Sequence, residues 1–99
     1  MWYILDKDNK PIKSNVIQCG EWMEDNPCVK ALKQEHIGNI YVSTVFLGLD
    51  HAWYGKIPVL WETMIFGGEH DQYQDRYTSV ENAEIGHQFA VQLVKNSNI

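Results

Sequence analysis

The sequence contains little cysteine and proline, a single arginine and no long hydrophobic run. The two cysteines, Cys19 and Cys28, do not form a Cys-x-x-Cys pair, which argues against a disulfide framework or a zinc knuckle. We therefore expect both to be reduced packing residues. The formal net charge of −5 argues against a binder of long nucleic acid, because such proteins need a basic surface to displace counterions from phosphates.

Membrane signals and standard catalytic motifs are also missing. No apolar stretch approaches membrane-spanning length, and the first residues lack the pattern of a secretory signal, so we predict no membrane association. The phosphate-binding, dinucleotide-binding, serine-hydrolase and zinc-protease motifs are absent. These absences favour a non-enzyme over an enzyme, and we predict no cofactor and no bound metal.

What the chain does contain is typical of one globular domain. Its 99 residues are 44% hydrophobic, and four tryptophans, five tyrosines and three phenylalanines supply much of the apolar surface that a small core must bury. This length leaves no room for a second core, so we predict a single domain over residues 1–99.

Two runs of β-branched, aromatic and aliphatic residues predict the central hairpin of a sheet. They cover residues 40–49 and 59–66, and the apolar residues of both parities in the first run indicate a strand covered on two faces. Residues 50–58 between them are too many for a tight turn and predict a presented loop. A hairpin over residues 2–13 and an exposed edge strand over residues 29–37 supply the remaining strands.

Helix signals lie on both sides of this sheet pattern. Asn15, with Gln18 three residues later, predicts the start of a short N-terminal helix. Thr78–Glu81 fits a capping box that starts a C-terminal amphipathic helix, whose apolar stripe includes Phe89 and Leu93. The predicted fold class is therefore α+β: an antiparallel sheet of about four to five strands packed against a C-terminal amphipathic helix, with a short additional N-terminal helix.

Four polar side chains are candidates for a catalytic or metal-binding group. Asp50 and His51 follow the central strand directly, where a rigid element can present a functional pair. Glu62 interrupts an apolar strand, and His87 falls within the apolar stripe of the last helix. Convergence of these residues would make a site of histidines and carboxylates. The alternatives are a carboxylate that holds turn amides, an outward-facing Glu62 and a hydrogen-bonded core histidine.

A second set of candidates suits an anionic or aromatic ligand. Arg76 and Tyr77 stand directly before the predicted helix start, where a guanidinium and helix amides can bind phosphate. The alternative for Arg76 is an ion pair with Asp75, Glu62 or another acid. On the long loop, Trp53 and Tyr54 can stack on a base or anchor a protein partner, or fold back over the core.

Four segments of the sequence also form a specific text pattern that covers most of the chain. They are Val42–His51 (VSTVFLGLDH), Pro58–Gly68 (PVLWETMIFGG), Asp75–Tyr77 (DRY) and Glu84–His87 (EIGH). This pattern resembles a family of small proteins encoded by tailed phages and prophages. The resemblance implies a setting rather than an activity and assigns no catalytic residue: such proteins often act in the host cytoplasm by disabling a defence enzyme or a nucleotide signal. The candidate positions that match it are Asp50, His51, Glu62, Arg76, Tyr77 and His87.

Three functions follow as hypotheses. The first is a non-enzymatic counter-defence or host-takeover protein that sequesters an anionic, nucleotide-like ligand or blocks a host defence protein, with the aromatics and arginine of the second set gripping the ligand. The second is a compact metal-dependent hydrolase that uses Asp50, His51, Glu62 and His87. The third is a structural protein-interaction module. Each hypothesis is compatible with a homo-oligomer, because a small domain with an apolar edge can bury more apolar surface by pairing with a second copy.

Overall fold

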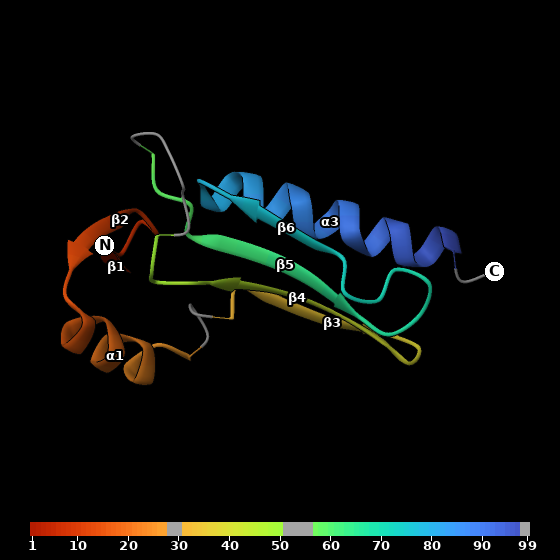
Figure 1. Cartoon of the computed structure of the whole chain (residues 1–99), viewed down its shortest axis with the longest axis horizontal. Coiled ribbons are helices and arrows are strands. Elements are labelled where there is room, and N and C mark those ends of the chain that lie inside the picture. The colour runs from red at the N-terminus through yellow and green to blue at the C-terminus, as the bar shows by residue number, and fades with distance from the viewer. Residues whose placement is uncertain (28–30, 51–56, 98–99) are drawn as a thin grey trace.

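The computed structural model describes residues 1–27, 31–50 and 57–97 and confirms the α+β fold class (Figure 1). A two-stranded hairpin and a short helix precede a four-stranded antiparallel sheet, and a long helix follows it. The elements are β1 (Trp2–Leu5), β2 (Pro11–Ser14), α1 (Val16–Asp25), β3 (Lys33–Ile37), β4 (Ile40–Phe46), β5 (Trp61–Phe66), β6 (Gln74–Tyr77) and α3 (Val80–Ser97).

The four-stranded sheet has the order β3-β4-β5-β6, with every neighbouring pair antiparallel. The predicted central hairpin forms β4 and β5, where Thr44 lies opposite Thr63. The predicted edge strand is confirmed, although β3 begins only at Lys33. Gly38 has a φ of 62° in the two-residue turn between β3 and β4, a conformation that favours glycine.

Strand β6 corrects one prediction. Arg76 was expected in the segment leading to the last helix, but it lies within β6, directly opposite Glu62 of β5. This register brings the guanidinium against a strand carboxylate rather than against a helix N-terminus. The ion pair that was the alternative for Arg76 therefore forms.

Helix α3 lies along one face of the sheet (Figure 1). Its cap differs from the prediction, because Ser79 rather than Thr78 accepts a hydrogen bond from the backbone amide of Asn82, at 3.1 Å. The residues that it buries are Ala83, His87, Ala90, Val91 and Val94. Phe89 was predicted in this buried stripe, but its side chain is exposed, because the sheet-facing centre of the helix falls on the alanines and valines instead.

At one end of the sheet, α1 packs against β1 (Figure 1). The predicted cap is confirmed, since the Asn15 side chain accepts a hydrogen bond from the Gln18 amide at 2.8 Å. Cys19 is buried and its thiol donates to the Tyr3 carbonyl at 3.2 Å, while burial raises the pKa of that thiol. Cys28 lies outside the described residues.

The core between sheet and helices consists of two apolar clusters. The first contains Tyr3, Leu5, Phe46, Leu60, Trp61, Tyr77 and Ala83, and the second contains Val42, Ile65, Ala90, Val91 and Val94. His87, Thr44 and Thr63 are buried polar residues within the same layer. Among the described helices, none combines the length and the hydropathy that a bilayer-spanning helix requires.

Candidate functional site

A chain of hydrogen bonds between buried polar side chains crosses the layer between α3 and the sheet. His87 on α3 is fully buried, and its Nδ1 lies 2.7 Å from the Thr44 hydroxyl, which lies 2.6 Å from the Thr63 hydroxyl. Its Nε2 lies 2.8 Å from a carboxylate oxygen of Glu35 on the edge strand. Each imidazole nitrogen therefore has a partner, as a buried histidine requires.

This chain of hydrogen bonds contains the three groups of a hydrolytic triad, but the groups are not accessible to a substrate. A carboxylate, an imidazole and a hydroxyl are linked in sequence, as in nucleophilic catalysis. However, Thr44 is completely buried beneath α3, so its hydroxyl cannot reach a substrate. Only the Glu35 side chain, which is 36% exposed, meets solvent. His87 is therefore a hydrogen-bonded core histidine, which was the alternative to a functional site. The chain of hydrogen bonds satisfies its buried polar groups.

The opposite face of the sheet is not covered by any described helix. Because side chains alternate along a strand, residues next to those beneath α3 point to this second face, which we call the open face. The open face comprises Gln34, His36, Tyr41, Ser43, Val45, Glu62, Met64, Phe66, Gln74 and Arg76.

Three rings form a row across one end of the open face. His36, Tyr41 and Phe66 are direct cross-strand neighbours on β3, β4 and β5. Their ring centroids lie 4.5 Å apart for the first pair and 6.1 Å apart for the second. Such pairs stabilise a sheet, but here they also present aromatic surface, since Phe66 is exposed.

A charged group occupies the other end of the open face. The Arg76 Nε donates to Glu62 Oε2 at 2.9 Å, and the Gln74 side-chain amide donates to the same oxygen. Arg76 also receives local support, because its backbone amide donates to the Asp75 carboxylate at 2.9 Å. The outward-facing alternative for Glu62 is therefore what the structure shows.

The remaining candidate residues lie in different places. The Asp50 carboxylate accepts a hydrogen bond from the Val59 amide at 2.9 Å and so joins the two ends of the loop between β4 and β5. His51, Trp53 and Tyr54 on that loop lie outside the described residues. Tyr77 is buried in the first core cluster, so its ring is not available to a ligand.

The Tyr77 hydroxyl is a buried polar atom that makes no hydrogen bond of normal geometry with the described residues. Burial raises the pKa of this phenol above its ordinary value of 10.0. Gly86 makes room for it, because a Cβ at that position would lie 2.1 Å from the hydroxyl oxygen. A glycine in α3 therefore lets the helix approach β6 closely.

The structure thus brings together only part of the predicted constellation. Glu62 and Arg76 meet on the open face, whereas His87 lies on the other side of the sheet, hydrogen-bonded to Thr44 of β4. Within residues 1–27, 31–50 and 57–97, no three His, Cys, Asp or Glu side chains are arranged to hold a metal ion.

Sequence reasoning did not identify Glu35, Thr44, Thr63, Tyr41 or Phe66. Thr44 and Thr63 carried a readable signal, because a hydroxyl in the middle of a strand predicted to be covered on both faces needs a buried partner. The sequence contained no signal for the row of His36, Tyr41 and Phe66, since cross-strand neighbours depend on the strand register.

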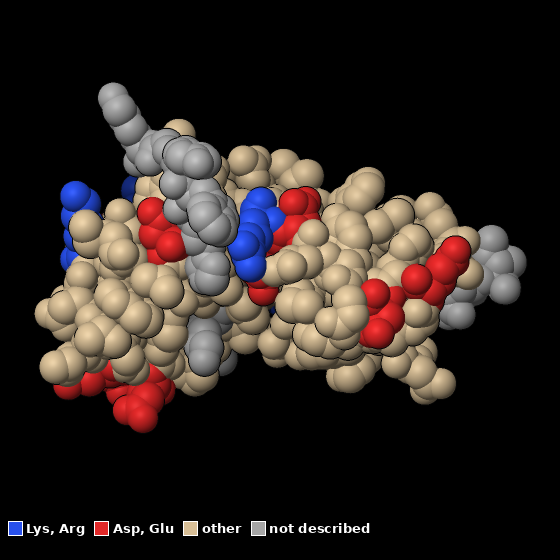
Figure 2. Space-filling view, in the orientation of Figure 1, with Lys and Arg blue, Asp and Glu red and all other residues tan. Residues whose placement is uncertain are grey.

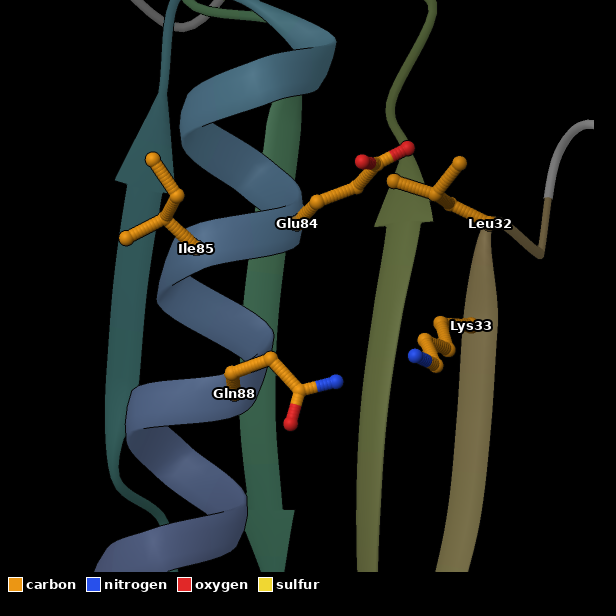
Figure 3. Close-up of a pocket in the computed structure, with 5 residues that line it drawn as sticks. All are labelled: Leu32, Lys33, Glu84, Ile85 and Gln88. Carbon is orange, nitrogen blue, oxygen red and sulfur yellow. The ribbon is translucent and has the colours of Figure 1, made fainter.

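A shallow groove of about 410 Å³ lies between α3 and the start of β3 (Figure 3). Glu84 and Gln88 point from the helix towards β3, whereas Ile85 points away from it. Leu32 and Lys33 line the opposite side. The groove is therefore lined by one cation, one carboxylate and apolar surface, a combination that does not favour any one class of ligand.

The fold and these surfaces define an α+β protein with one helix-covered sheet face and one open face. No protein-family model, no curated protein and no solved structure matches the chain.

Proposed function

We propose that this protein is a non-catalytic binding protein that docks on a partner protein through the open face of its sheet. The row of His36, Tyr41 and Phe66 is the observation that carries this proposal. Large rings, with Met64 and a paired arginine beyond them, have the composition of a protein-binding centre with a polar rim.

A protein partner fits this surface better than an anionic, nucleotide-like ligand does. The Arg76 guanidinium is bound to the Glu62 carboxylate, so a phosphate must compete with an existing charge pair. Tyr77, the second residue expected to grip such a ligand, is buried. The acidic net charge of −5 adds a further repulsive contribution for anions.

The binding function also accounts for the candidate residues better than a compact hydrolase does. That enzyme needs Glu62 and His87 in one site, and they lie on opposite faces of the sheet. The acid, imidazole and hydroxyl that do meet are shielded by α3, and only Glu35 meets solvent. A binding surface needs none of these groups to react.

The sequence resemblance to phage-encoded proteins supplies the setting of the proposal. We place the partner among bacterial defence proteins in the cytoplasm of the infected host, with this protein acting as a counter-defence factor that blocks it. The resemblance alone supports this part, and the open face supports the binding mode.

Native mass spectrometry of tagged protein from infected cells with active defences tests the proposal. We expect a retained protein partner, and a Tyr41→Ser, Phe66→Ser double variant should lose about tenfold or more in affinity, because it removes the exposed rings. Ile17→Ser is the matched control, since Ile17 is an exposed apolar residue on α1. It should retain the partner.

Two outcomes would overturn this function. A partner retained equally by the double variant would exclude the open face as the binding surface. A retained nucleotide-type mass that disappears in Arg76→Ala would replace the protein partner with the anionic ligand.

A further inference from the structure

Helix α3 has an apolar spot on its solvent side that the single chain does not bury. Ile85 is 68% exposed and Phe89 is 57% exposed. They lie four residues apart, so they are neighbours on one side of the helix. Together they place a large aliphatic and a large aromatic side chain on the surface farthest from the core.

Between the first and last turns, this solvent side carries uncharged amides. Asn82, Gln92 and Asn96 lie beside the apolar spot, and the Gln92 amide donates to Asn96 Oδ1 at 2.8 Å. In Figure 2 the upper right edge of the molecule, along which α3 runs in Figure 1, is tan, and an acidic group (red) stands next to a basic one (blue) at the upper middle. Aromatic enrichment with depletion of charge distinguishes the centre of a protein interface from ordinary surface.

We propose that this side of α3 packs antiparallel against α3 of a second copy, forming a two-fold homodimer. The two ends of the helix carry opposite charges, with Glu81 in the first turn and Lys95 in the last turn. In the antiparallel arrangement, Glu81 meets Lys95 of the second copy, and the symmetry makes this pair twice. A parallel arrangement would put like charges together at both ends.

Within the part of the chain that the structure describes, these two charges have no oppositely charged partner, since neither Glu81 nor Lys95 forms an ion pair there. Fourteen residues separate them along α3, which is about 21 Å at the helical rise per residue, so they cannot pair within one chain. The helix is 18 residues long, about 27 Å, and this limits the interface to the lower end of specific dimers. We therefore expect a reversible dimer that dissociates on dilution.

The dimer leaves the open face free. Because α3 covers the other face of the sheet, pairing through α3 puts the two helices in the middle and the two open faces on the outside. The inference stands independently of the proposed function, since it concerns a different surface.

Sedimentation velocity over a concentration series measures the dimer directly. We expect the mass to rise from 11.5 kDa for one chain towards twice that value as concentration increases. Phe89→Glu should abolish the rise, whereas Phe66→Glu, an exposed phenylalanine on the open face, should leave it unchanged. Circular dichroism establishes that both variants remain folded. A wild-type protein that stays monomeric at millimolar concentration would overturn the inference, and so would loss of the dimer only in Phe66→Glu.

A charge exchange tests the antiparallel orientation. Glu81→Lys and Lys95→Glu should each weaken self-association, because each creates like-charge pairs at both ends of the dimer. An equimolar mixture of the two variants should recover association, since every pair in the mixed dimer is again of opposite sign. Recovery can come only from contacts between chains. Failure of the mixture to associate more strongly than either variant alone would overturn the antiparallel arrangement.

Discussion

The two faces of the sheet each carry a carboxylate paired with a basic side chain from another element, and the two basic side chains differ in burial. On the helix-covered face, Glu35 lies 2.8 Å from His87. On the open face, Glu62 lies 2.9 Å from Arg76. The contact distances are almost equal, yet the His87 side chain is fully buried and the Arg76 side chain is 40% exposed. The carboxylates have the reverse order, since Glu35 is 36% exposed and Glu62 is 13% exposed.

This comparison shows that environment, rather than contact distance, determines the energetic weight of a polar pair. Water can replace Glu62 around the Arg76 guanidinium, which is 40% exposed, so the net gain from the open-face pair is small. Beneath α3, no water reaches His87 or Thr44, and an unsatisfied group there retains its full desolvation cost. The buried chain should therefore contribute to stability, and the exposed pair should be free to serve binding.

The largest expected effect comes from His87→Ala on the buried side. The change removes a buried ring and takes from the buried Thr44 hydroxyl one of its two hydrogen-bond partners, leaving only Thr63, while the partly exposed Glu35 carboxylate exchanges its partner for solvent. We expect the free energy of unfolding to fall by about 3 to 5 kcal/mol, measured by urea denaturation.

His36→Ala on the open face is the matched control, because His36 is an exposed histidine on β3. It should cost less than about 1 kcal/mol. Equal losses for the two histidines would mean that the two faces do not differ as described.

An intermediate effect is expected from Tyr77→Phe, which removes a buried hydroxyl that makes no hydrogen bond of normal geometry with the described residues. We expect a gain of about 1 kcal/mol in the free energy of unfolding at neutral pH. Tyr41→Phe is the control on the open face, where the phenol is only partly buried, and it should change this free energy little.

The same variant sharpens the comparison at alkaline pH. Burial raises the pKa of Tyr77 in the folded state, so the unfolded state loses this phenolic proton first as pH rises. The contribution of the protonated Tyr77 phenol to the free energy of unfolding is complete below its ordinary pKa of 10.0. This contribution is lost as pH rises through the pKa of Tyr77 in the folded state. Denaturation measured across that range should show a smaller alkaline loss in Tyr77→Phe. An identical loss in the wild-type protein would contradict this assignment.

The smallest effect is expected for the exposed pair. A double-mutant cycle with Arg76→Ala and Glu62→Gln should give a coupling energy below about 1 kcal/mol, decreasing with added salt. Denaturation midpoints at low and high salt provide the measurement. A salt-independent coupling above about 2 kcal/mol would show that this pair behaves as a buried one.

Local signals in the sequence predicted the elements of the fold well. The Asn15 cap, the central hairpin and the C-terminal helix follow from short-range hydrogen bonding and hydrophobic periodicity, which neighbouring residues determine. The errors are strand β6, which was expected to be the segment leading to the last helix, and two single positions: the cap of α3 is Ser79 rather than Thr78, and Phe89 faces solvent. A projection of the helix gives its amphipathic direction only approximately, since packing selects which residues meet the sheet.

The candidate site was predicted less well, because its residues become neighbours through strand register. Glu62 and Arg76 were identified separately, and their pairing was one of several alternatives. His87 was expected either in a site or in the core, and its contacts with Thr44 and Glu35 place it in the core. His51, Trp53 and Tyr54 remain predictions.

By itself, the sequence determined the α+β class, the capped helices and the strands of the central hairpin, because these depend on contacts between residues close in the chain. Only the tertiary structure decided that Glu62 and His87 lie on opposite faces of the sheet and that Phe89 faces outward. The physical reason is that the side-chain direction alternates along a strand and follows the packed face of a helix. Which direction is buried depends on partners that are distant in sequence.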